Sequence, residues 1–398
     1  MNIYVTGIGI VSGIGMNTGE TIASIREGKT GIGRLTLFDS VHQDTVPVSE
    51  VKRSNIALQE LLGLPEKNVF SRTALLGMMA TGEALKDAGV TVEEKRDTVL
   101  VSSTSVGGMD LSEGYYRQMK ENERKTRLRN IISHDGGDST GKIAAYHGLN
   151  PMATTISTAC SSAANAIMFG AGLIRQGYTE RVIAGGTDAL TLFTINGFRS
   201  LMILDPDPCR PFDDTRSGLN LGEGAGYIVM ESEQALMRKG KQPYCRLSGY
   251  GNVNDAFHQT ASSPEGNGPF LAMKKALEQS TLSPEQIAYI NVHGTGTPNN
   301  DLSEGRAIER LFQESVPRFS STKAFTGHTL GAAGGIEAVL SVLSLKHGLI
   351  YPNLNFAYPM HDLRIAPEKA LSTSFPVHHV LSNSFGFGGN CSSLVFSV

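Results

Sequence analysis

The sequence lacks the features that would direct it to a membrane, to secretion or to nucleic acid. No apolar run approaches the roughly 18 residues that a membrane-spanning helix needs. The best candidate, residues 163–174, is shorter and contains Asn165. The N-terminus resembles a strand and not a signal peptide, and a net charge of −3 gives no electrostatic footprint for nucleic acid. We therefore expect a cytoplasmic protein without a membrane or nucleic-acid partner.

Cysteine is scarce as well. The four cysteines stand at positions 160, 209, 245 and 391 and form no CxxC pair. The sequence therefore predicts no metal site and no disulfide framework, as is usual in a reducing compartment. With 398 residues and 40% hydrophobic residues, the chain can bury a large core as two or three domains or as one duplicated unit.

Short apolar runs alternate with helical patterns, which predicts an α/β fold. We expect strands at residues 2–6, 98–103, 181–185 and 287–292, and helices at 73–88, 160–176, 270–279 and 330–346. The charged segment 117–129 favours a solvated surface helix or loop.

Two regions share one design, which indicates an internal duplication. In each, a short Ser/Thr-rich run leads into a small-residue turn and then an apolar helix that should be buried. One region contains Cys160, and the other contains His328. A boundary near residue 245 divides the chain into an N-terminal half, 1–245, and a C-terminal half, 246–398.

Cys160 stands at the start of a predicted helix, where unpaired N–H groups and the helix dipole stabilise a thiolate. A lone buried cysteine is more often inert, but two histidines could serve this one, His293 and His328. One reaction that needs two histidines is thioester condensation with loss of carbon dioxide. Two N–H donors would then stabilise an enolate oxygen, as an oxyanion hole does. Thr295 and Thr297 could bond the amides of a thioester arm, or could only stabilise their turn.

With these residues in place, the chain resembles the β-ketoacyl-acyl carrier protein synthases, the elongating condensing enzymes of the thiolase-like superfamily. The resemblance runs essentially from end to end. Its motifs lie at residues 5–12, 158–162, 209–213, 222–226, 293–304, 323–334 and 383–389. No single motif is decisive, but all of them in this order are highly specific.

The resemblance implies roles for individual residues. Cys160 would accept the acyl group, and His293 and His328 would bind the thioester carbonyl of a decarboxylating malonyl unit. Lys323 would set the electrostatics of that site together with Glu337. The backbone N–H groups of Cys160 and Phe387 would form a second oxyanion hole. Phe387 could also swing as a gate, and Val106 would line the acyl pocket.

The resemblance also implies a fold and partners. The fold would be a five-layered αβαβα sandwich of two similar halves, with the active residues at its centre. Relatives are usually homodimers, although a hetero-pair with a related subunit is also open. No cofactor is implied, since substrates arrive on the phosphopantetheine of acyl carrier protein. Relatives dock this acidic carrier on a basic rim, for which the candidates here are Arg72, Arg124, Lys125, Arg127, Arg129 and Arg199.

Two segments depart from the family pattern. Asn390-Cys391 replaces the Thr-Asn that commonly follows the last glycine pair, and Arg216-Ser217-Gly218-Leu219 replaces Arg-Asp-Gly-Phe. Neither departure touches the three catalytic positions. Both leave the substrate preference open, including a specialised branch that makes polyene or other secondary acyl products.

Other classes of function are weaker alternatives. Residues 137–141 satisfy the GxSxG pattern of a serine hydrolase around Ser139, but the strand that this motif requires is missing before it. Gly7-Ile8-Gly9 has the wrong spacing for a dinucleotide loop. A non-condensing partner subunit of a ketosynthase pair would lack the active cysteine, which this chain keeps.

Overall fold

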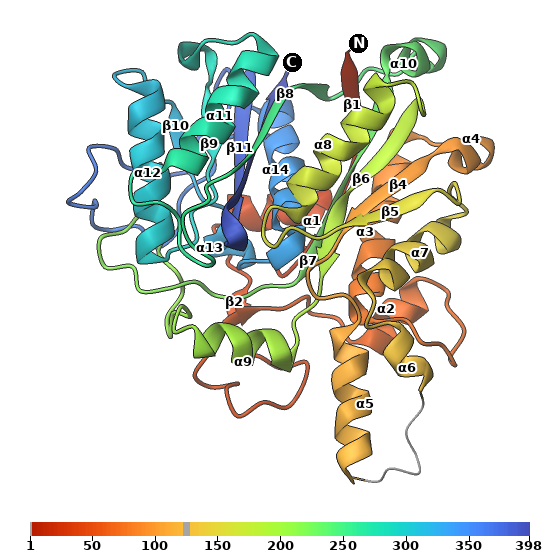
Figure 1. Ribbon diagram of the computed structural model, residues 1–398. Coiled ribbons are helices and arrows are strands. Elements are labelled where there is room, and N and C mark those ends of the chain that lie inside the picture. The colour runs from red at the N-terminus through yellow and green to blue at the C-terminus, as the bar shows by residue number, and fades with distance from the viewer. Residues whose placement is uncertain (1, 122–127) are drawn as a thin grey trace.

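A ten-stranded sheet runs through the protein in the order β10-β9-β11-β12-β8-β1-β7-β6-β4-β5. The computed structural model describes residues 2–121 and 128–398 (Figure 1). The N-terminal strands are β1 (Ile3–Ser12), β4 (Val99–Ser103), β5 (Ala153–Ile156), β6 (Arg181–Asp188) and β7 (Gly224–Ser232). The C-terminal strands are β8 (Cys245–Asn254), β9 (Tyr289–Asn291), β10 (Arg318–Ser320), β11 (His379–Gly386) and β12 (Asn390–Ser397). The four strands predicted from the sequence are all present.

The two halves of this sheet have the same topology. The N-terminal order is β5-β4-β6-β7-β1, and the C-terminal order is β10-β9-β11-β12-β8. In each half the first two pairings are parallel and the last two are antiparallel. The halves join where β1 pairs with β8 through Tyr4↔Arg246 and Val5↔Cys245. An identical strand order confirms the predicted duplication.

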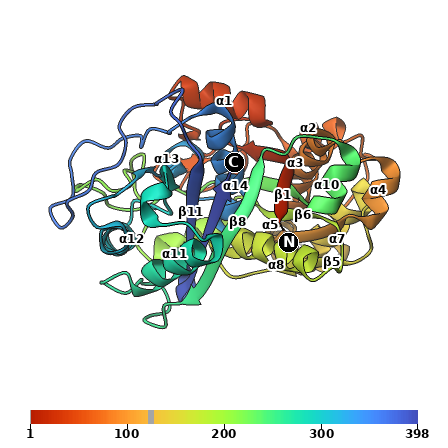
Figure 2. The same ribbon diagram turned by 90° about the horizontal axis from the view of Figure 1, so that it is seen from above.

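Helices complete the five layers of the predicted sandwich (Figure 2). In the N-terminal half these are α3 (Arg72–Ala88), α7 (Gly136–His147) and α8 (Ser162–Arg175). Their C-terminal counterparts are α11 (Asn267–Ser280), α12 (Pro298–Phe312) and α14 (Ala333–His347). Helices α8 and α14 pack together between the two halves of the sheet, while α3 with α7 and α11 with α12 form the outer layers.

The central helices are buried to different degrees. Every residue of α14 from Ala333 to Leu345 is buried. Its close approach to β7 requires a glycine there, since a Cβ on Gly226 would lie 2.3 Å from the backbone nitrogen of Ile336. Helix α8 is buried on the side that faces α14, but Phe169 is 46% exposed. Full burial was therefore a correct prediction for α14 and wrong for the outer face of α8.

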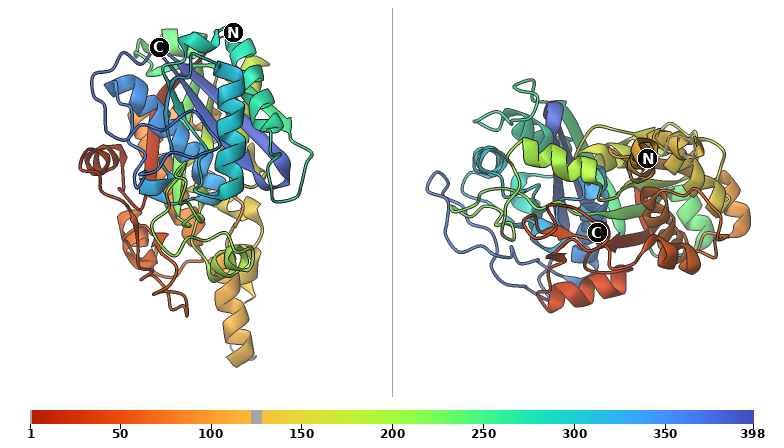
Figure 3. Two further views of the ribbon diagram at one scale, coloured as in Figure 1. Left: turned by 90° about the vertical axis from the view of Figure 1, so that its left-hand side faces the viewer. Right: turned by 90° about the horizontal axis from the view of Figure 1, so that it is seen from below.

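The described parts of the charged segment, residues 117–121 and 128–129, lie at the periphery, as predicted, and residues 122–127 lie outside the described residues. Helix α5 (Met109–Glu121) has no buried residue within its described range and projects from the body of the molecule (Figure 3). It is followed by α6 (Arg129–Ile132). The remaining elements are α1 (Thr18–Arg26), β2 (Ile32–Gly33), β3 (Val48–Ser49), α2 (Asn55–Leu61), α4 (Val92–Asp97), α9 (Leu192–Ser200), α10 (Glu233–Lys239), α13 (Lys323–Thr326) and the short 3₁₀ turns η2 (Pro284–Gln286), η3 (Leu330–Ala332) and η4 (Phe387–Gly389). Within residues 2–121 and 128–398, no helix has the length and apolar character to cross a membrane.

Candidate active site

The turn that leads into α8 carries Cys160. Ala159 adopts a left-handed backbone with φ +52°, which makes the turn sharp. Cys160 follows it, two residues before the first helical residue, and its side chain is buried. The predicted position of this cysteine at the start of a helix is confirmed.

The resting cysteine is a thiol. Burial raises the pKa of Cys160 to about 11, although the Lys323 ammonium and the Phe387 backbone N–H act in the opposite direction. Burial therefore outweighs the helix N-terminus that favoured a thiolate in the sequence analysis. The N–H of Phe387 is one of the two donors expected around the acyl-cysteine carbonyl, and together with the N–H of Cys160 it acts to lower this pKa.

His328 lies directly beside this sulfur. Its Nε2 atom is 3.1 Å from Cys160 Sγ. Its Nδ1 atom accepts the backbone N–H of Leu330 at 3.3 Å. Burial, with a further contribution from Lys323, holds the pKa of His328 well below its usual range, so the ring is neutral. A neutral ring that accepts at Nδ1 carries its proton at Nε2, and His328 therefore points an N–H donor at the reacting sulfur.

His293 has the same tautomer for a different reason. The Lys323 Nζ atom donates to the His293 carbonyl oxygen at 2.6 Å and lies 3.3 Å from His293 Nδ1. An ammonium group only donates, so Nδ1 accepts and Nε2 carries the proton. Burial and then Lys323 hold the pKa of His293 well below its usual range. Lys323 also forms a buried ion pair with Glu337, as expected, and burial raises the pKa of that carboxyl to about 7.

These tautomers bear on metal binding. The ligating atoms of Cys160, His293 and His328 lie within 4.8 Å of one another, which is close enough to surround one ion. A histidine ligates a metal through an unprotonated nitrogen. Both Nδ1 atoms already face donors, so the Nε2 atom of each histidine carries a proton. These three residues are therefore better suited to donate hydrogen bonds to a substrate oxygen than to ligate a metal ion.

Two carboxylates in α12 hold the His293 loop, and their roles were not predicted from the sequence. Glu304 accepts the backbone N–H groups of His293 and Gly294, each at 2.9 Å. Asp301 accepts the N–H of Thr295 at 2.9 Å. The i, i+3 spacing of the two acids places them on one face of the helix. That spacing was the available signal, but it did not show which loop the acids would face.

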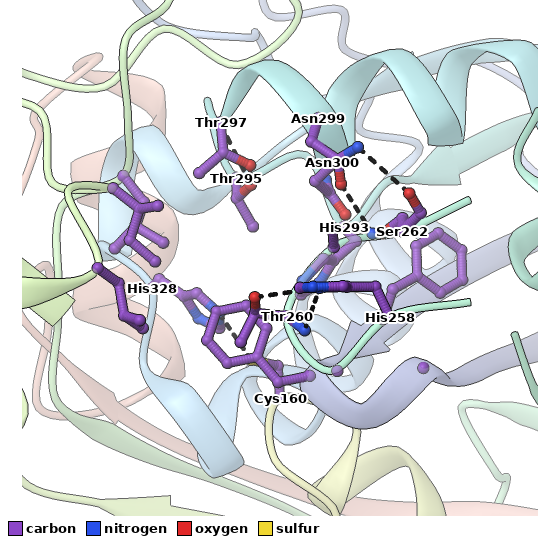
Figure 4. A pocket seen from close by; sticks show the side chains of 18 of the residues that line it. Cys160, His258, Thr260, Ser262, His293, Thr295, Thr297, Asn299, Asn300 and His328 are labelled. Atoms are coloured by element: carbon purple, nitrogen blue, oxygen red, sulfur yellow. Dashed lines mark hydrogen bonds between the residues drawn. The ribbon is translucent and has the colours of Figure 1, made fainter. Parts of the chain in front are cut away.

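The three reactive residues open onto a cavity of about 320 Å³. Thr295 and Thr297 line it, and their hydroxyl groups are 2.8 Å apart. Cys160 lies at the opposite end of the drawn cavity from Thr297 and Asn299 (Figure 4). The cavity therefore joins the sulfur to a polar mouth, as a bound thioester arm requires.

Phe387 and Leu219 lie in the wall of this cavity, whereas Val106 does not. The ring of Phe387 is stacked on Phe198, with centroids 6.0 Å apart. Val106 is buried in the hydrophobic cluster to which Leu219 belongs and against which Phe198 packs. It therefore stands behind the cavity wall.

Ser139 does not form the elbow of a serine hydrolase. It lies within the first turn of α7, is buried, and donates its hydroxyl to the Gly136 carbonyl at 2.8 Å. A turn precedes that helix where the elbow requires a strand. The hydrolase alternative is therefore not favoured.

The predicted basic rim is only partly present. Arg72 is buried and its guanidinium pairs with Glu223 at 2.6 Å, so this residue cannot dock a partner. The prediction that Arg72 docks a carrier was wrong, because the buried Glu223 carboxylate needs a positive partner and Arg72 provides it. Arg199 and Arg129 are exposed, on α9 and α6 respectively. The other candidates, Arg124, Lys125 and Arg127, lie outside the described residues.

Comparisons with known proteins agree with this geometry. Residues 1–235 match the family described as "Beta-ketoacyl synthase, N-terminal domain", and residues 244–357 match "Beta-ketoacyl synthase, C-terminal domain". The 3-oxoacyl-[acyl-carrier-protein] synthase 2 of Staphylococcus aureus is 34% identical over 411 residues, covering 100% of this chain and 98% of the relative. The protein of the same name from Vibrio harveyi is 32% identical over 408 residues, covering 99% and 98%.

Solved structures give the same result. The ishigamide ketosynthase/chain length factor aligns with a TM-score of 0.92 and 29% identity, covering 100% of this chain and 99% of the other. The Xenorhabdus doucetiae ketosynthase ApeO, in complex with its chain length factor ApeC, aligns with a TM-score of 0.84 and 29% identity, covering 100% and 98%. Since the family matches span both halves and relatives align from end to end, the chain belongs to the β-ketoacyl synthase family of condensing acyltransferases.

Proposed function

We propose that this enzyme joins an acyl group held on Cys160 to a malonyl unit on acyl carrier protein and releases carbon dioxide. The observation that carries the proposal is the arrangement at the sulfur. Cys160 Sγ lies 3.1 Å from a neutral histidine donor, and Phe387, whose backbone N–H acts to lower the pKa of Cys160, lines the same cavity. One set of donors can then serve the acyl-cysteine, and the histidine pair can serve the malonyl thioester.

In the first step, Cys160 sulfur attacks the carbonyl carbon of an acyl thioester. The N–H groups of Cys160 and Phe387 bind the carbonyl oxygen as it becomes negative. The bond to the carrier sulfur then breaks, and the cysteine proton passes to that leaving thiolate. The products are the acyl-cysteine and free acyl carrier protein.

In the second step, a malonyl thioester occupies the same mouth. The Nε2–H groups of His293 and His328 bind its thioester oxygen and stabilise the enolate that remains when carbon dioxide leaves. The enolate carbon attacks the acyl-cysteine carbonyl, the carbon–sulfur bond breaks, and Cys160 recovers a proton from solvent. The chain is then two carbons longer and is held on the carrier as a β-ketoacyl thioester. These steps need no resident cofactor or metal.

Phe387 is proposed as the gate between the two substrates. It follows Gly386 and precedes Gly388, whose φ of +80° few other residues adopt. Because its ring rests on Phe198 at the cavity wall, a rotation of this short turn would open one side of the cavity. Thr295 and Thr297 are proposed to bond the amides of the phosphopantetheine arm at the polar mouth.

A second subunit and a cytoplasmic location complete the proposal. Strand β5 forms one edge of the sheet and pairs only with β4 among the described strands, and nearby α8 exposes Phe169. A homodimer, or a pair with a related subunit, would cover these faces. The similarity to ketosynthases studied with chain length factors supports a pair with a related subunit. The four cysteines are unpaired, which suits the cytoplasm.

The test combines the protein with malonyl carrier protein and a panel of acyl carrier proteins, and measures product masses. We expect a two-carbon extension for at least one acyl group and an acyl adduct on Cys160. If no acyl group is extended and no adduct forms on Cys160, the proposal is wrong. Labelling of Ser139 by a fluorophosphonate, with Cys160 unlabelled, would support the hydrolase instead.

A further inference from the structure

A polar cluster beside the Cys160 turn takes no part in the steps above. Asn390 lies at its centre and belongs to one of the two segments where this chain departs from the family pattern. The members come from both halves of the chain and are Thr158, Ser161, Asn165, Asn252, Asn390 and Ser392. The cluster therefore connects the two halves of the chain beside the Cys160 turn.

The Oδ1 atom of Asn390 is the shared acceptor. Asn165 Nδ2 lies 2.8 Å from it and Asn252 Nδ2 2.9 Å. Ser161 Oγ lies 2.7 Å from Asn390 Oδ1 and 2.7 Å from the Thr158 carbonyl oxygen, so these two acceptors share the one hydroxyl hydrogen. Asn165 accepts from Asn252 with its own oxygen, at 3.0 Å, so its amide nitrogen faces Asn390. Amide nitrogens only donate, and Asn390 must therefore present its oxygen to them.

This acceptor joins the two turns that carry the proposed oxyanion donors. Ser161 directly follows Cys160, and Asn390 directly follows the turn Phe387–Gly389. The turns also touch, since a Cβ on Gly386 would lie 3.2 Å from the Cys160 backbone nitrogen. Two glycines with φ near +80° leave the second turn little stiffness of its own. Its spacing from the first turn therefore depends on contacts such as those of Asn390.

We propose that Asn390 is a positioning residue that holds the Cys160 and Phe387 turns at the spacing their N–H groups need to bind the acyl-cysteine carbonyl oxygen. Asn390 is not among the residues that line the cavity, so it acts through these turns without touching substrate. The inference rests on the proposed function, because it requires Cys160 to be the acyl acceptor. A threonine at this position has a shorter side chain and would not reach all three donors.

The histidine donors are held by other contacts. Lys323 and Glu304 position His293, and the Leu330 N–H positions His328. Loss of Asn390 should therefore slow the transfer of an acyl group onto Cys160 and leave malonyl decarboxylation almost unchanged. A general loss of structure would slow both reactions.

The experiment compares N390L, which removes the acceptor at similar size, with N390D, which keeps an oxygen in place. We expect N390L to lower the rate of acyl transfer from an acyl carrier protein to Cys160 by about 10- to 100-fold, because small misplacements in a site cost this much. In a Cys160→Gln background it should leave malonyl decarboxylation within about twofold. N390D should recover part of the transfer rate, and its charge should move the iodoacetamide alkylation profile of Cys160 to higher pH. N252A is the matched control, since Asn252 belongs to the cluster but does not contact the Cys160 turn.

Two results would overturn the inference: transfer by N390L at the wild-type rate, or equal losses of transfer and decarboxylation. Thermal denaturation shows whether N390L is folded, and if it is not, N390T takes its place with an intermediate loss expected. Failure of the proposed function is distinguishable, since the wild-type enzyme would then form no acyl adduct on Cys160 with any carrier.

Discussion

The two halves of the sheet share one topology, but the turns that enter their central helices differ in burial and charge. In the N-terminal half, the turn before α8 presents Cys160, lies against the polar Asn390 cluster, and leads into a helix with one exposed face. In the C-terminal half, α14 is fully buried from Ala333 to Leu345 and holds Glu337 against Lys323. The nucleophile therefore follows the less buried turn, and the donor His328 lies at the deeply buried one.

The difference shows how a duplicated scaffold acquires two chemical roles. The repeat brings two equivalent turns together. Burial then shifts the pKa values of the cysteine and of the histidines in opposite directions. Burial raises the pKa of the Cys160 thiol and lowers the pKa of His293 and His328. All three groups are therefore neutral at rest, which suits donors that stabilise negative charge only as it develops.

The largest expected effect is a complete separation of condensation, which needs Cys160, from malonyl decarboxylation, which does not. Cys160→Gln should abolish condensation and leave malonyl decarboxylation measurable. His328→Ala should lower decarboxylation by about 10²–10³-fold, the usual cost of one oxyanion donor, while iodoacetamide still alkylates Cys160. Product masses and carbon dioxide release measure the two reactions.

The control for this experiment is Cys245→Ala, which changes another buried cysteine outside the cavity and should keep both activities. If Cys160→Gln loses decarboxylation while it stays folded, the assignment of one task to each half is wrong.

The next effect concerns the buried pair of the C-terminal half. Lys323→Met should lower the free energy of unfolding by about 3–5 kcal/mol, since it leaves the Glu337 carboxylate unpaired in the core. Adding Glu337→Leu should restore much of this stability without restoring activity. Denaturant unfolding measures both changes.

A partly exposed pair of the N-terminal half is the comparison for that result. Lys142 and Asp138 are 2.7 Å apart, with side chains 19% and 16% exposed. Lys142 also donates to the Val69 carbonyl and to Ser133 Oγ, so Lys142→Met should cost about 1–3 kcal/mol, less than Lys323→Met. Equal losses from the two lysine substitutions would contradict the contrast between a buried C-terminal turn and a more solvated N-terminal half.

The pH dependence should also differ between the turns. Since the pKa values of His293 and His328 lie well below 6.5, their neutral forms persist through neutral pH. Decarboxylation by the Cys160→Gln variant should therefore show no loss from histidine protonation down to pH 6.5, and a change near pH 7 would report Glu337 instead. The unfolded chain binds these protons more readily, so the histidines' contribution to stability is present above pH 6.5 and is lost as the pH falls below it.

Alkylation of wild-type Cys160 should behave in the opposite way. Because burial raises its pKa to about 11, the iodoacetamide rate should still rise about tenfold per pH unit between pH 8 and 10, following the thiolate fraction. A rate that levels off near neutral pH would show that the cysteine is already ionised at rest.

The smallest effect concerns the cavity wall. Leu219 lines the cavity at a position where the family commonly has phenylalanine. Leu219→Phe should narrow it and lower kcat/KM for the longest accepted acyl group by about tenfold, with little change for the shortest. A uniform change across the acyl panel would show that Leu219 does not select chain length.

The ordered motifs were sufficient to predict the family, the duplication and the meeting of Cys160 with His293, His328 and Lys323. They could not predict which arginines are exposed, because Arg72 is buried by its pairing with Glu223, far away in the sequence. Three further features could not be predicted from the sequence. Val106 lies behind the cavity wall, Glu304 accepts hydrogen bonds from the His293 loop, and Asn390 lies at the centre of the polar cluster. Each of these features depends on contacts between segments that are distant in the chain.

The residue types and the local turns can be predicted from the chain alone: a cysteine at a helix start, two histidines in glycine-rich loops, and two repeats of one pattern. Periodicity and turn chemistry act over a few residues, and a single sequence records them directly. The protonation states depend on the fold, since burial and the neighbours of each Nδ1 atom determine where each histidine proton lies. The fold also decides that one asparagine ties two turns from different halves, because a hydrogen bond between distant segments exists only after the sheet has brought them together.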